Sequence, residues 1–226
     1  MDSLQDFLKR HKVRSYEKNC TILQQDVVPE CAFVIKKGVI GTYNVTETGD
    51  EHPIGFGLRG KFFPLGWLFG KTYRTQYYYR TLSACEVYMV PKEELLTFLG
   101  TSAQVMSQVL DQCIGELINH EMRISALSQS KAGDKVLRTI HHLSLCFGRD
   151  LRTDVVEIPL PLTQRDIANF AGLTRETTGA ELKQLAERGI LTVKRKKYIV
   201  MTDRLNRLLD DEYDQQLVRY SAICQK

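Results

Sequence analysis

The chain has 226 residues, of which 43% are hydrophobic and 26% are charged, a balance typical of one large or two small globular domains. It contains no apolar run of about 18 residues and no basic-then-apolar signal pattern at the N-terminus, so we expect a cytoplasmic protein without a membrane span. The net charge of +4 indicates a polyanion partner only if the basic residues are concentrated in one segment.

The first ninety residues have the pattern of a short helix followed by a β domain. An amphipathic helix is expected over residues 2–12. From residue 13 to 90, short β-rich runs alternate with glycine-containing turns, and Thr48-Gly49-Asp50 is typical of a hairpin turn. These features predict a small sandwich or barrel.

Residues 91–129 change to a helical pattern. Pro91 suits the first turn of a short helix that Gly100 is expected to close, and a long helix is expected over residues 102–129. Apolar residues recur in it with the alternating four- and three-residue spacing of a coiled-coil seam. The seam consists of Met106, Leu110, Cys113, Leu117, His120, Ile124 and Leu127.

A second apolar set borders this seam, so the long helix needs two surfaces to cover it. The bordering set is Val105, Val109, Ile114, Ile118 and Met122. One surface can be the chain's own β domain, and the other is most simply the same helix of a second copy, which predicts an isologous homodimer. The alternative is a helix buried inside one domain. His120 is expected to be solvated, to fix the register, or to contact something bound beside the helix.

Another amphipathic helix is expected over residues 131–147, with Gly148 as its cap. A polar loop over 148–154 and a short extended piece over 157–161 follow it.

The next segment predicts a winged helix-turn-helix. Thr163 suits an N-cap, Gly172 suits the left-handed turn that ends the first helix, and Thr174 suits the cap of a second helix that Gly189 ends. The inward face of the second helix is expected to be Leu173, Thr178, Leu182 and Leu185. Residues 190–201 then predict a β-hairpin with a basic tip, which would be the wing.

Residues 163–201 hold eight basic and four acidic residues, and this excess equals the net charge of the whole chain. In a helix-turn-helix the second helix enters the major groove with its first turn at the base edges. Arg175 can donate two hydrogen bonds to guanine, and Glu176 can accept one from cytosine, so these two residues and Thr178 are the predicted base-reading set. Phosphate contacts are expected from Thr163, Thr174, Thr177, Lys183, Lys194, Arg195, Lys196 and Lys197. The competing interpretation is a solvated helix end and a solvated basic wing.

The six cysteines are Cys20, Cys31, Cys85, Cys113, Cys146 and Cys224. They are scattered and form no Cys-x-x-Cys pair, so we predict no metal, neither zinc nor a clustered iron–sulfur site, and reduced thiols. Thiol sensing by Cys20, Cys31 or Cys113 stays open as an alternative.

The sequence resembles the CRP/FNR family of bacterial transcription regulators. The stretches that carry the resemblance are LTQRDIANFAGLTRETTGAELKQL, GKFFPLGWLF and ACEVYMV. The resemblance implies an α+β chain with a sensory antiparallel β-barrel or jelly roll of the cyclic-nucleotide-binding type over 1–100. It also implies a dimerisation helix over 101–130 and a winged helix-turn-helix over 131–226. The implied partners are a second copy, a palindromic site on double-stranded DNA, and RNA polymerase.

Two departures from the family pattern stand out. Ala180 replaces an arginine that is frequent in the family's recognition helix, so we expect a different preferred half-site. In nucleotide-binding members the phosphate cassette reads Gly-Glu-Leu and then Arg-Ser or Arg-Thr, whereas this chain has Pro64-Leu65-Gly66 and Thr75-Gln76. We therefore expect that cyclic AMP is not the effector, unless Arg74 or Arg80 compensates.

No cofactor is predicted, but an unknown small-molecule effector stays open. Its candidate pocket is Leu65, Gly66, Trp67, Arg74, Thr75, Gln76, Tyr77 and His120. The alternative role of the aromatic residues is packing within the β domain. Haem bound through His11, His52 or His120 has no support from the spacing.

The sequence therefore predicts a homodimeric, sequence-specific DNA-binding transcription regulator. The alternative is a small-molecule-binding signalling module whose helix-turn-helix serves protein contacts. An enzyme is not expected, because the chain has no Gly-rich phosphate loop, no Gly-x-Ser-x-Gly motif and no paired-histidine metal motif.

Overall fold

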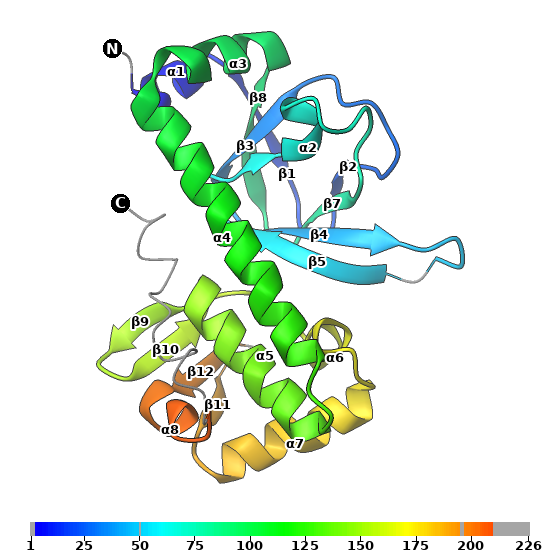
Figure 1. Ribbon diagram of the computed structural model, residues 1–226, viewed down its shortest axis with the longest axis vertical. Helices are drawn as coiled ribbons and strands as arrows, with labels where there is room; N and C mark the ends of the chain where they lie inside the picture. The colour runs from blue at the N-terminus through cyan, green and yellow to red at the C-terminus, as the bar shows by residue number, and fades with distance from the viewer. Residues whose placement is uncertain (1–2, 50, 195–196, 210–226) are drawn as a thin grey trace. The chain divides into compact units, whose positions relative to one another are not determined.

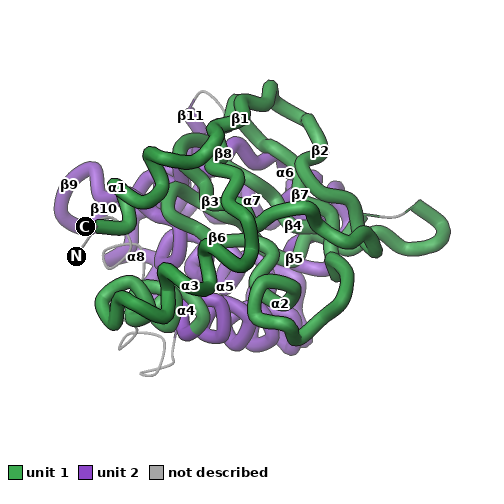
Figure 2. The backbone as a smooth tube through the Cα atoms, turned by 90° about the horizontal axis from the view of Figure 1, so that it is seen from above, with its two compact units in different colours: residues 1–113 green, residues 114–226 purple. Residues whose placement is uncertain are grey.

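A computed structural model describes residues 3–49, 51–194 and 197–209 of two compact units, formed by residues 1–113 and 114–226 (Figures 1 and 2). The boundary falls inside one long helix, α4 (Ala103–Leu127), which contributes to both units. The predicted α+β class is confirmed, whereas the finer division at residues 100 and 130 stays a prediction. Across the described residues, no helix combines the length and the apolar character needed to cross a membrane.

The described part of the first unit contains two four-stranded antiparallel sheets, in the orders β1-β8-β3-β6 and β2-β7-β4-β5. Their strands are β1 (Lys12–Tyr16), β2 (Thr21–Leu23), β3 (Ala32–Lys37), β4 (Ile40–Val45), β5 (Glu51–Gly57), β6 (Phe62–Phe63), β7 (Tyr78–Thr81) and β8 (Cys85–Val90). Gly49 has the positive φ of 86° that a tight turn between β4 and β5 requires. Asp50, the last residue of that predicted turn, lies outside the described residues.

Strand β3 divides the apolar core of the first unit. Ala32 and Val34 belong to one buried cluster, and Phe33 and Ile35 belong to another. Successive side chains of a strand point to opposite faces of the sheet, so a strand with four consecutive buried residues has apolar neighbours on both sides.

The described part of the first unit also contains three whole helices and the N-terminal part of α4. The three are α1 (Leu4–Lys9), α2 (Leu65–Leu68) and α3 (Lys92–Thr101). The ring of Phe7 in α1 stacks on that of Phe98 in α3, with centroids 4.0 Å apart. The prediction that Gly100 closes α3 was wrong, because the helix continues to Thr101. The extended conformation of Ser102 separates α3 from α4, so no left-handed glycine is needed there.

Helix α4 leaves most of its predicted seam exposed. The exposed fractions are 39% for Met106, 57% for Leu110, 58% for Leu117 and 63% for Ile124. Cys113 and His120 are also exposed, and Leu127 is half-buried. The bordering apolar set is divided, since Val105, Val109 and Met122 are buried, Ile118 is half-buried and Ile114 is 44% exposed. The alternative of a helix buried on all sides within one domain is therefore contradicted.

In the second unit, α5 (Ala132–Phe147) ends at Gly148, whose N–H donates to Ser144 O at 3.0 Å. The predicted polar loop after Gly148 was wrong, because it forms β9 (Arg149–Arg152), paired with β10 (Val155–Ile158). Every residue of β9 is exposed, so no apolar alternation marked it as a strand. Asp154, with φ 57°, lies in the turn.

The helix-turn-helix and the wing follow as predicted. The elements are α6 (Gln164–Ala171), α7 (Arg175–Glu187), β11 (Leu191–Lys194), β12 (Lys197–Met201) and α8 (Thr202–Asn206). Strands β11 and β12 form the antiparallel hairpin and extend a sheet of order β11-β12-β10-β9. The most buried apolar side chains of this unit include Ile140, Leu143, Ile158, Ile167 and Leu191.

Candidate nucleic-acid interface

A capping box opens α6. The Thr163 hydroxyl accepts from the Asp166 N–H at 3.2 Å, and the Asp166 carboxylate accepts from both the N–H and the hydroxyl of Thr163 at 2.7 Å. The hydroxyl proton of Thr163 is thus already donated within the helix cap. Thr163 therefore fixes the start of α6, and its predicted phosphate contact would compete with Asp166.

Gly172 makes the turn between α6 and α7. It has φ 65° and ψ 41°, a left-handed conformation that strains any residue carrying a Cβ. The N–H of Leu173 donates to Ala168 O at 3.0 Å and closes the turn. The direction of α7 relative to α6 therefore depends on this glycine, as the sequence predicted.

The first turn of α7 is built by two threonines. The Thr174 hydroxyl accepts from the Thr177 N–H at 3.2 Å and lies 3.0 Å from the Thr177 hydroxyl. Arg175 and Glu176 follow the cap and are exposed. The N-terminus of a helix also presents N–H groups and a partial positive charge, both of which suit a phosphate. This turn therefore combines a guanidinium, a carboxylate and an anion-binding helix end.

Thr178 does not belong to the base-reading set. Its side chain has 0% exposure, and its hydroxyl has no hydrogen-bond partner among the described residues. It faces inward with Leu182 and Leu185, which are also buried. The prediction that Thr178 reads a base was wrong, whereas its inward position on α7 is confirmed.

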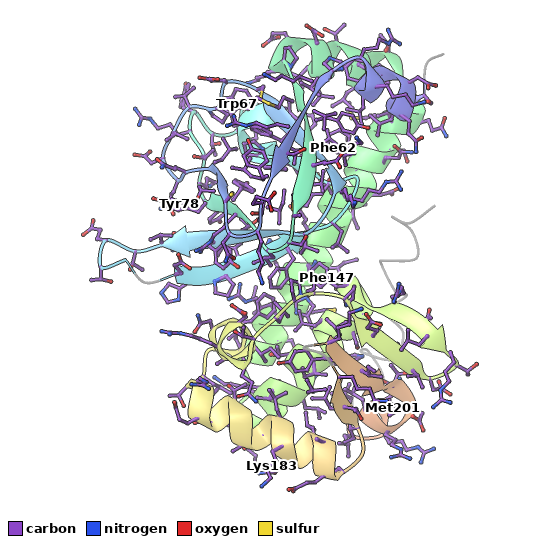
Figure 3. All side chains as sticks on the ribbon, turned by 180° about the vertical axis from the view of Figure 1, so that it is seen from behind. Phe62, Trp67, Tyr78, Phe147, Lys183 and Met201 are labelled. Carbon is purple, nitrogen blue, oxygen red and sulfur yellow. The ribbon has the colours of Figure 1, made fainter. Side chains whose placement is uncertain are left out.

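The predicted phosphate-binding cations have different surroundings. Lys183 is exposed on α7, 3.7 Å from Glu187, and extends away from the helix (Figure 3). Lys194 is exposed at the end of β11, while Arg195 and Lys196 lie outside the described residues. Lys197, in contrast, donates to Glu157 of β10 at 2.6 Å.

Glu157 is an acidic residue that sequence reasoning missed. Its side chain is only 8% exposed and accepts from Lys197 and, at 3.2 Å, from Arg149 of β9. These two cations hold the pKa of the Glu157 carboxyl below its usual value, and Lys197 has the larger effect. The only available signal was an acidic residue inside the apolar run of residues 155–158.

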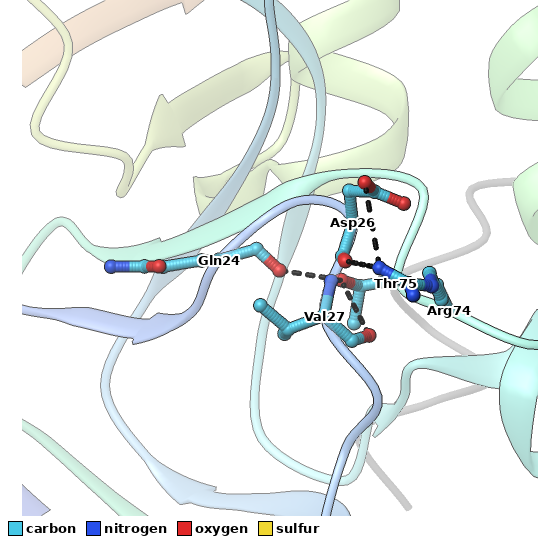
Figure 4. A network of polar contacts seen from close by, with 5 residues as sticks. All are labelled: Gln24, Asp26, Val27, Arg74 and Thr75. Carbon is cyan, nitrogen blue, oxygen red and sulfur yellow. Dashed lines mark hydrogen bonds and ion pairs between the residues drawn. The ribbon is translucent and has the colours of Figure 1, made fainter.

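An open pocket in the first unit contains part of the predicted effector site. It is lined by Gln25, Asp26, Thr72, Tyr73, Arg74, Thr75 and Gln76. The buried Thr75 hydroxyl donates to Gln24 O at 2.5 Å and accepts from the Val27 N–H at 3.1 Å (Figure 4). Arg74 donates to Asp26 O at 3.0 Å. The loop over 71–77 is therefore fastened to the segment over 24–27 by these polar groups.

The other predicted effector residues lie elsewhere. Trp67 was wrongly placed in the pocket, because it is buried in the apolar core with Leu68 while Lys92 lies over its ring. Leu65 packs against the same core, and Tyr77 against the second cluster. The Gly66 carbonyl accepts from the N–H groups of residues 71 and 72, and His120 belongs to the other compact unit. Arg80 donates to Glu51 and lies over the Tyr43 ring, so it does not line the pocket.

His11 and Cys31, considered for haem and for thiol chemistry, have surroundings that suit other roles. His11 contacts Phe7 O and Glu94 through its two ring nitrogens. Burial raises the pKa of the Cys31 thiol, which disfavours a reactive thiolate. Within the described ranges, no three His, Cys, Asp or Glu side chains gather as a metal site would require.

The second unit contains a further set of contacts that the sequence did not reveal. The Arg123 guanidinium of α4 lies over the Phe170 ring of α6, 4.4 Å from its centroid. His142 of α5 bonds through Nε2 to the Asn119 side chain of α4, and its ring centroid lies 5.4 Å from that of Phe170. The pKa of His142 is lowered to about 3, so the ring is neutral. Burial is the largest cause, and the charges of Arg123 and two histidines add to it.

Known proteins resemble both parts of the chain. The model of the cyclic nucleotide-binding domain matches residues 13–102, and that of the Crp-like helix-turn-helix domain matches residues 134–208. The Electron transport regulator A of Shewanella oneidensis is 28% identical over 203 residues, which cover 90% of this chain and 79% of that protein. The Fumarate nitrate reduction regulatory protein of Klebsiella oxytoca is 28% identical over 201 residues, which cover 89% and 78%. The structure of FixK2 from Bradyrhizobium japonicum has a TM-score of 0.71 and 24% identity, with 88% of this chain and 96% of that chain covered.

Proposed function

The chain belongs to the CRP/FNR family of bacterial transcription regulators, and we propose that it acts as a homodimer that reads a palindromic DNA site. The observation that carries this proposal is the exposed pair Arg175 and Glu176 on the first turn of α7. The helix buries Thr178, Leu182 and Leu185, whereas both charged side chains stay exposed. A guanidinium in the major groove can pair with guanine O6 and N7, and a carboxylate with cytosine N4.

The exposed seam of α4 supports the homodimer. Leu110, Leu117 and Ile124 are each more than half exposed in the single chain and recur at coiled-coil spacing. Because the same stripe is present on every copy, a two-fold axis along the helix lets two stripes cover each other. The two recognition helices of such a dimer would meet half-sites roughly 34 Å apart on one face of the DNA.

The pocket beside Arg74 supports an effector other than cyclic AMP. The residue after Gly66 is Trp67 and not a carboxylate. The Arg74 guanidinium already donates to Asp26 O. A cyclic phosphate bound there would have to replace this internal contact before it could pair with the guanidinium. A regulator that binds chromosomal DNA would work in the bacterial cytoplasm.

Selection of bound duplexes from a random library tests the proposed function. The wild-type chain should enrich a palindrome, and Arg175→Ala should cost about 1–3 kcal/mol and relax the preference at one base pair of each half-site. Arg188→Ala is the matched control, because Arg188 is exposed at the far end of the same helix. Arg188→Ala should leave the preference for particular base pairs unchanged.

Two results would count against this assignment. If Arg175→Ala weakened every duplex equally, Arg175 would be a phosphate contact and not a base reader. If the wild-type chain enriched no duplex at low ionic strength, the helix-turn-helix would serve protein contacts instead.

A further inference from the structure

Arg123 joins the C-terminal half of α4 to the helix-turn-helix. Its guanidinium lies 4.4 Å from the centroid of the buried Phe170 ring in α6, and burial lowers the pKa of this arginine. A planar cation over an aromatic face has a preferred direction and distance, so this contact restricts how α6 can turn relative to α4.

Asn119 makes a second link one helical turn earlier. Residues four apart lie on the same side of a helix, so Asn119 and Arg123 face the same neighbours. The Asn119 side-chain oxygen accepts from His142 Nε2 of α5, and the His142 ring in turn lies beside Phe170. Since His142 is neutral, only the tautomer with the proton on Nε2 can donate here.

Two apolar contacts belong to the same segment of α4, at Met122 between Asn119 and Arg123 and at Leu127 after both. The sulfur atoms of Met122 and Cys146 lie 4.0 Å apart in a buried position. A Cβ placed on Gly172 would lie 3.0 Å from a methyl group of Leu127, so the end of α4 reaches the turn of the helix-turn-helix itself. One side of α4 thus contacts α5, α6 and the turn before α7.

The exposed seam lies on other positions of the same helical segment. Leu117 and Ile124 are 58% and 63% exposed, and His120 between them is also exposed. Because an α-helix is stiff over a few turns, the angle between the seam and the contacts of Arg123 is fixed by the helix geometry.

We propose that Arg123 and Asn119 are positioning residues that fix the direction of the recognition helix relative to the dimer seam, and so determine the spacing between the two half-sites. This inference rests on the proposed function, since it requires a dimer that reads two half-sites. One added base pair moves a half-site by about 3.4 Å and rotates it by roughly 34°. If the contacts of Arg123 and Asn119 hold the helix-turn-helix rigidly, the dimer should bind the changed site more weakly.

The test compares Arg123→Met with wild type on palindromes of altered spacing. Methionine keeps a long apolar side chain over Phe170 but removes the charge and the plane of the guanidinium. Affinity is measured on the selected palindrome, on versions with one base pair added or removed, and on a duplex with a single half-site. The matched control is Arg14→Met, because Arg14 lies 5.0 Å over the Tyr16 ring in the other unit.

Wild type and Arg14→Met should prefer the selected spacing by about tenfold, within the usual range of coupling between two sites. Arg123→Met should reduce this preference to about threefold or less while its affinity for the single half-site stays within about twofold of wild type. Loss of folding alone would lower half-site binding, so the spacing profile separates positioning from stability.

Asn119→Ala gives a second, independent measurement and decides the matter if Arg123→Met loses half-site binding. It should flatten the spacing profile in the same direction. A profile as sharp as that of wild type, in a variant that still binds the half-site, would overturn the inference and leave the proposed function intact. A wild-type chain without any palindrome preference would instead remove the proposed function.

Discussion

Glu157 and Lys197 form an ion pair of 2.6 Å between neighbouring strands, at the end of β12 where the wing hairpin turns, and Arg149 adds a second cation to the same carboxylate. Two of the basic residues near the wing are therefore balanced by an internal acid. We predict that Glu157→Gln releases them toward DNA phosphates, so that binding becomes tighter at low salt and depends more steeply on salt. Each new phosphate contact should add about 0.9 to the slope of log affinity against log salt concentration.

The matched control for this prediction is Glu86→Gln. Glu86 accepts from Lys36 at the same distance of 2.6 Å, but on the β domain. Glu86→Gln should leave the slope of log affinity against log salt concentration unchanged. Equal slopes for wild type and Glu157→Gln would mean that Lys197 and Arg149 stay away from the DNA.

Thr178 carries a buried hydroxyl that costs stability. We predict that Thr178→Val, which keeps the shape and removes the unpaired hydroxyl, raises the free energy of unfolding by about 1 kcal/mol without changing the DNA preference. Thr177→Val is the control and should lower stability, because that hydroxyl bonds to Thr174. Urea denaturation and duplex selection measure the two effects. A changed base preference in Thr178→Val would restore Thr178 to the base-reading set.

His142 predicts a dependence of stability on pH. Its folded pKa of about 3 lies below the ordinary value of 6.5, so between these two values the unfolded chain binds a proton that the folded chain does not. The free energy of unfolding should therefore fall as the pH is lowered from about 6.5, by up to roughly 1.4 kcal/mol per pH unit from this residue. The charges of Arg123, His141 and His120 also disfavour protonation of the ring and lower its pKa in the same direction.

Urea denaturation between pH 7 and 4.5 measures this dependence. His142→Gln removes the titrating group and keeps an N–H donor for Asn119, so its stability should fall less steeply than that of wild type. His52→Gln, at an exposed histidine, should follow wild type. Parallel curves for wild type and His142→Gln would contradict the assignment of a neutral buried ring.

Cys113 reports on the proposed dimer because it lies on the exposed seam of α4. Seam residues of a two-fold pair approach their own equivalents, so a short bis-maleimide should link two chains through Cys113. Electrophoresis under reducing conditions should show a band of twice the chain mass, which Cys113→Ser removes and Cys20→Ser keeps. A linked band that survives in Cys113→Ser would place the contact between copies elsewhere.

The elements of the helix-turn-helix could be predicted because their signals are local. Thr163, Gly172 and Thr174 specify caps and a left-handed turn through atoms within four residues of each other. Thr178 shows where this reasoning fails. It lies three residues after Arg175 and so near the same side of α7, but the boundary between the buried and exposed sides depends on helices packed from elsewhere.

Contacts between distant residues could not be predicted in this way. Arg123 and Phe170 are 47 residues apart in the sequence, and Glu157 and Lys197 are 40 apart. Each residue alone reads as an ordinary charged or aromatic residue of its element. Strand β9 was missed for a related reason, because hydrogen bonds to β10 hold it in place and its side chains contribute no apolar pattern.

In the proposed complex with DNA, Glu176 would let the exposed turn of α7 disfavour some sequences as well as bind others. A carboxylate brought into a groove loses hydration and approaches the negative field of the phosphates, which is unfavourable on most sequences. Only a base that offers an amino group at the matching place offsets that loss. The carboxylate would therefore discourage long residence on unrelated chromosomal sequence and shorten the search for the operator.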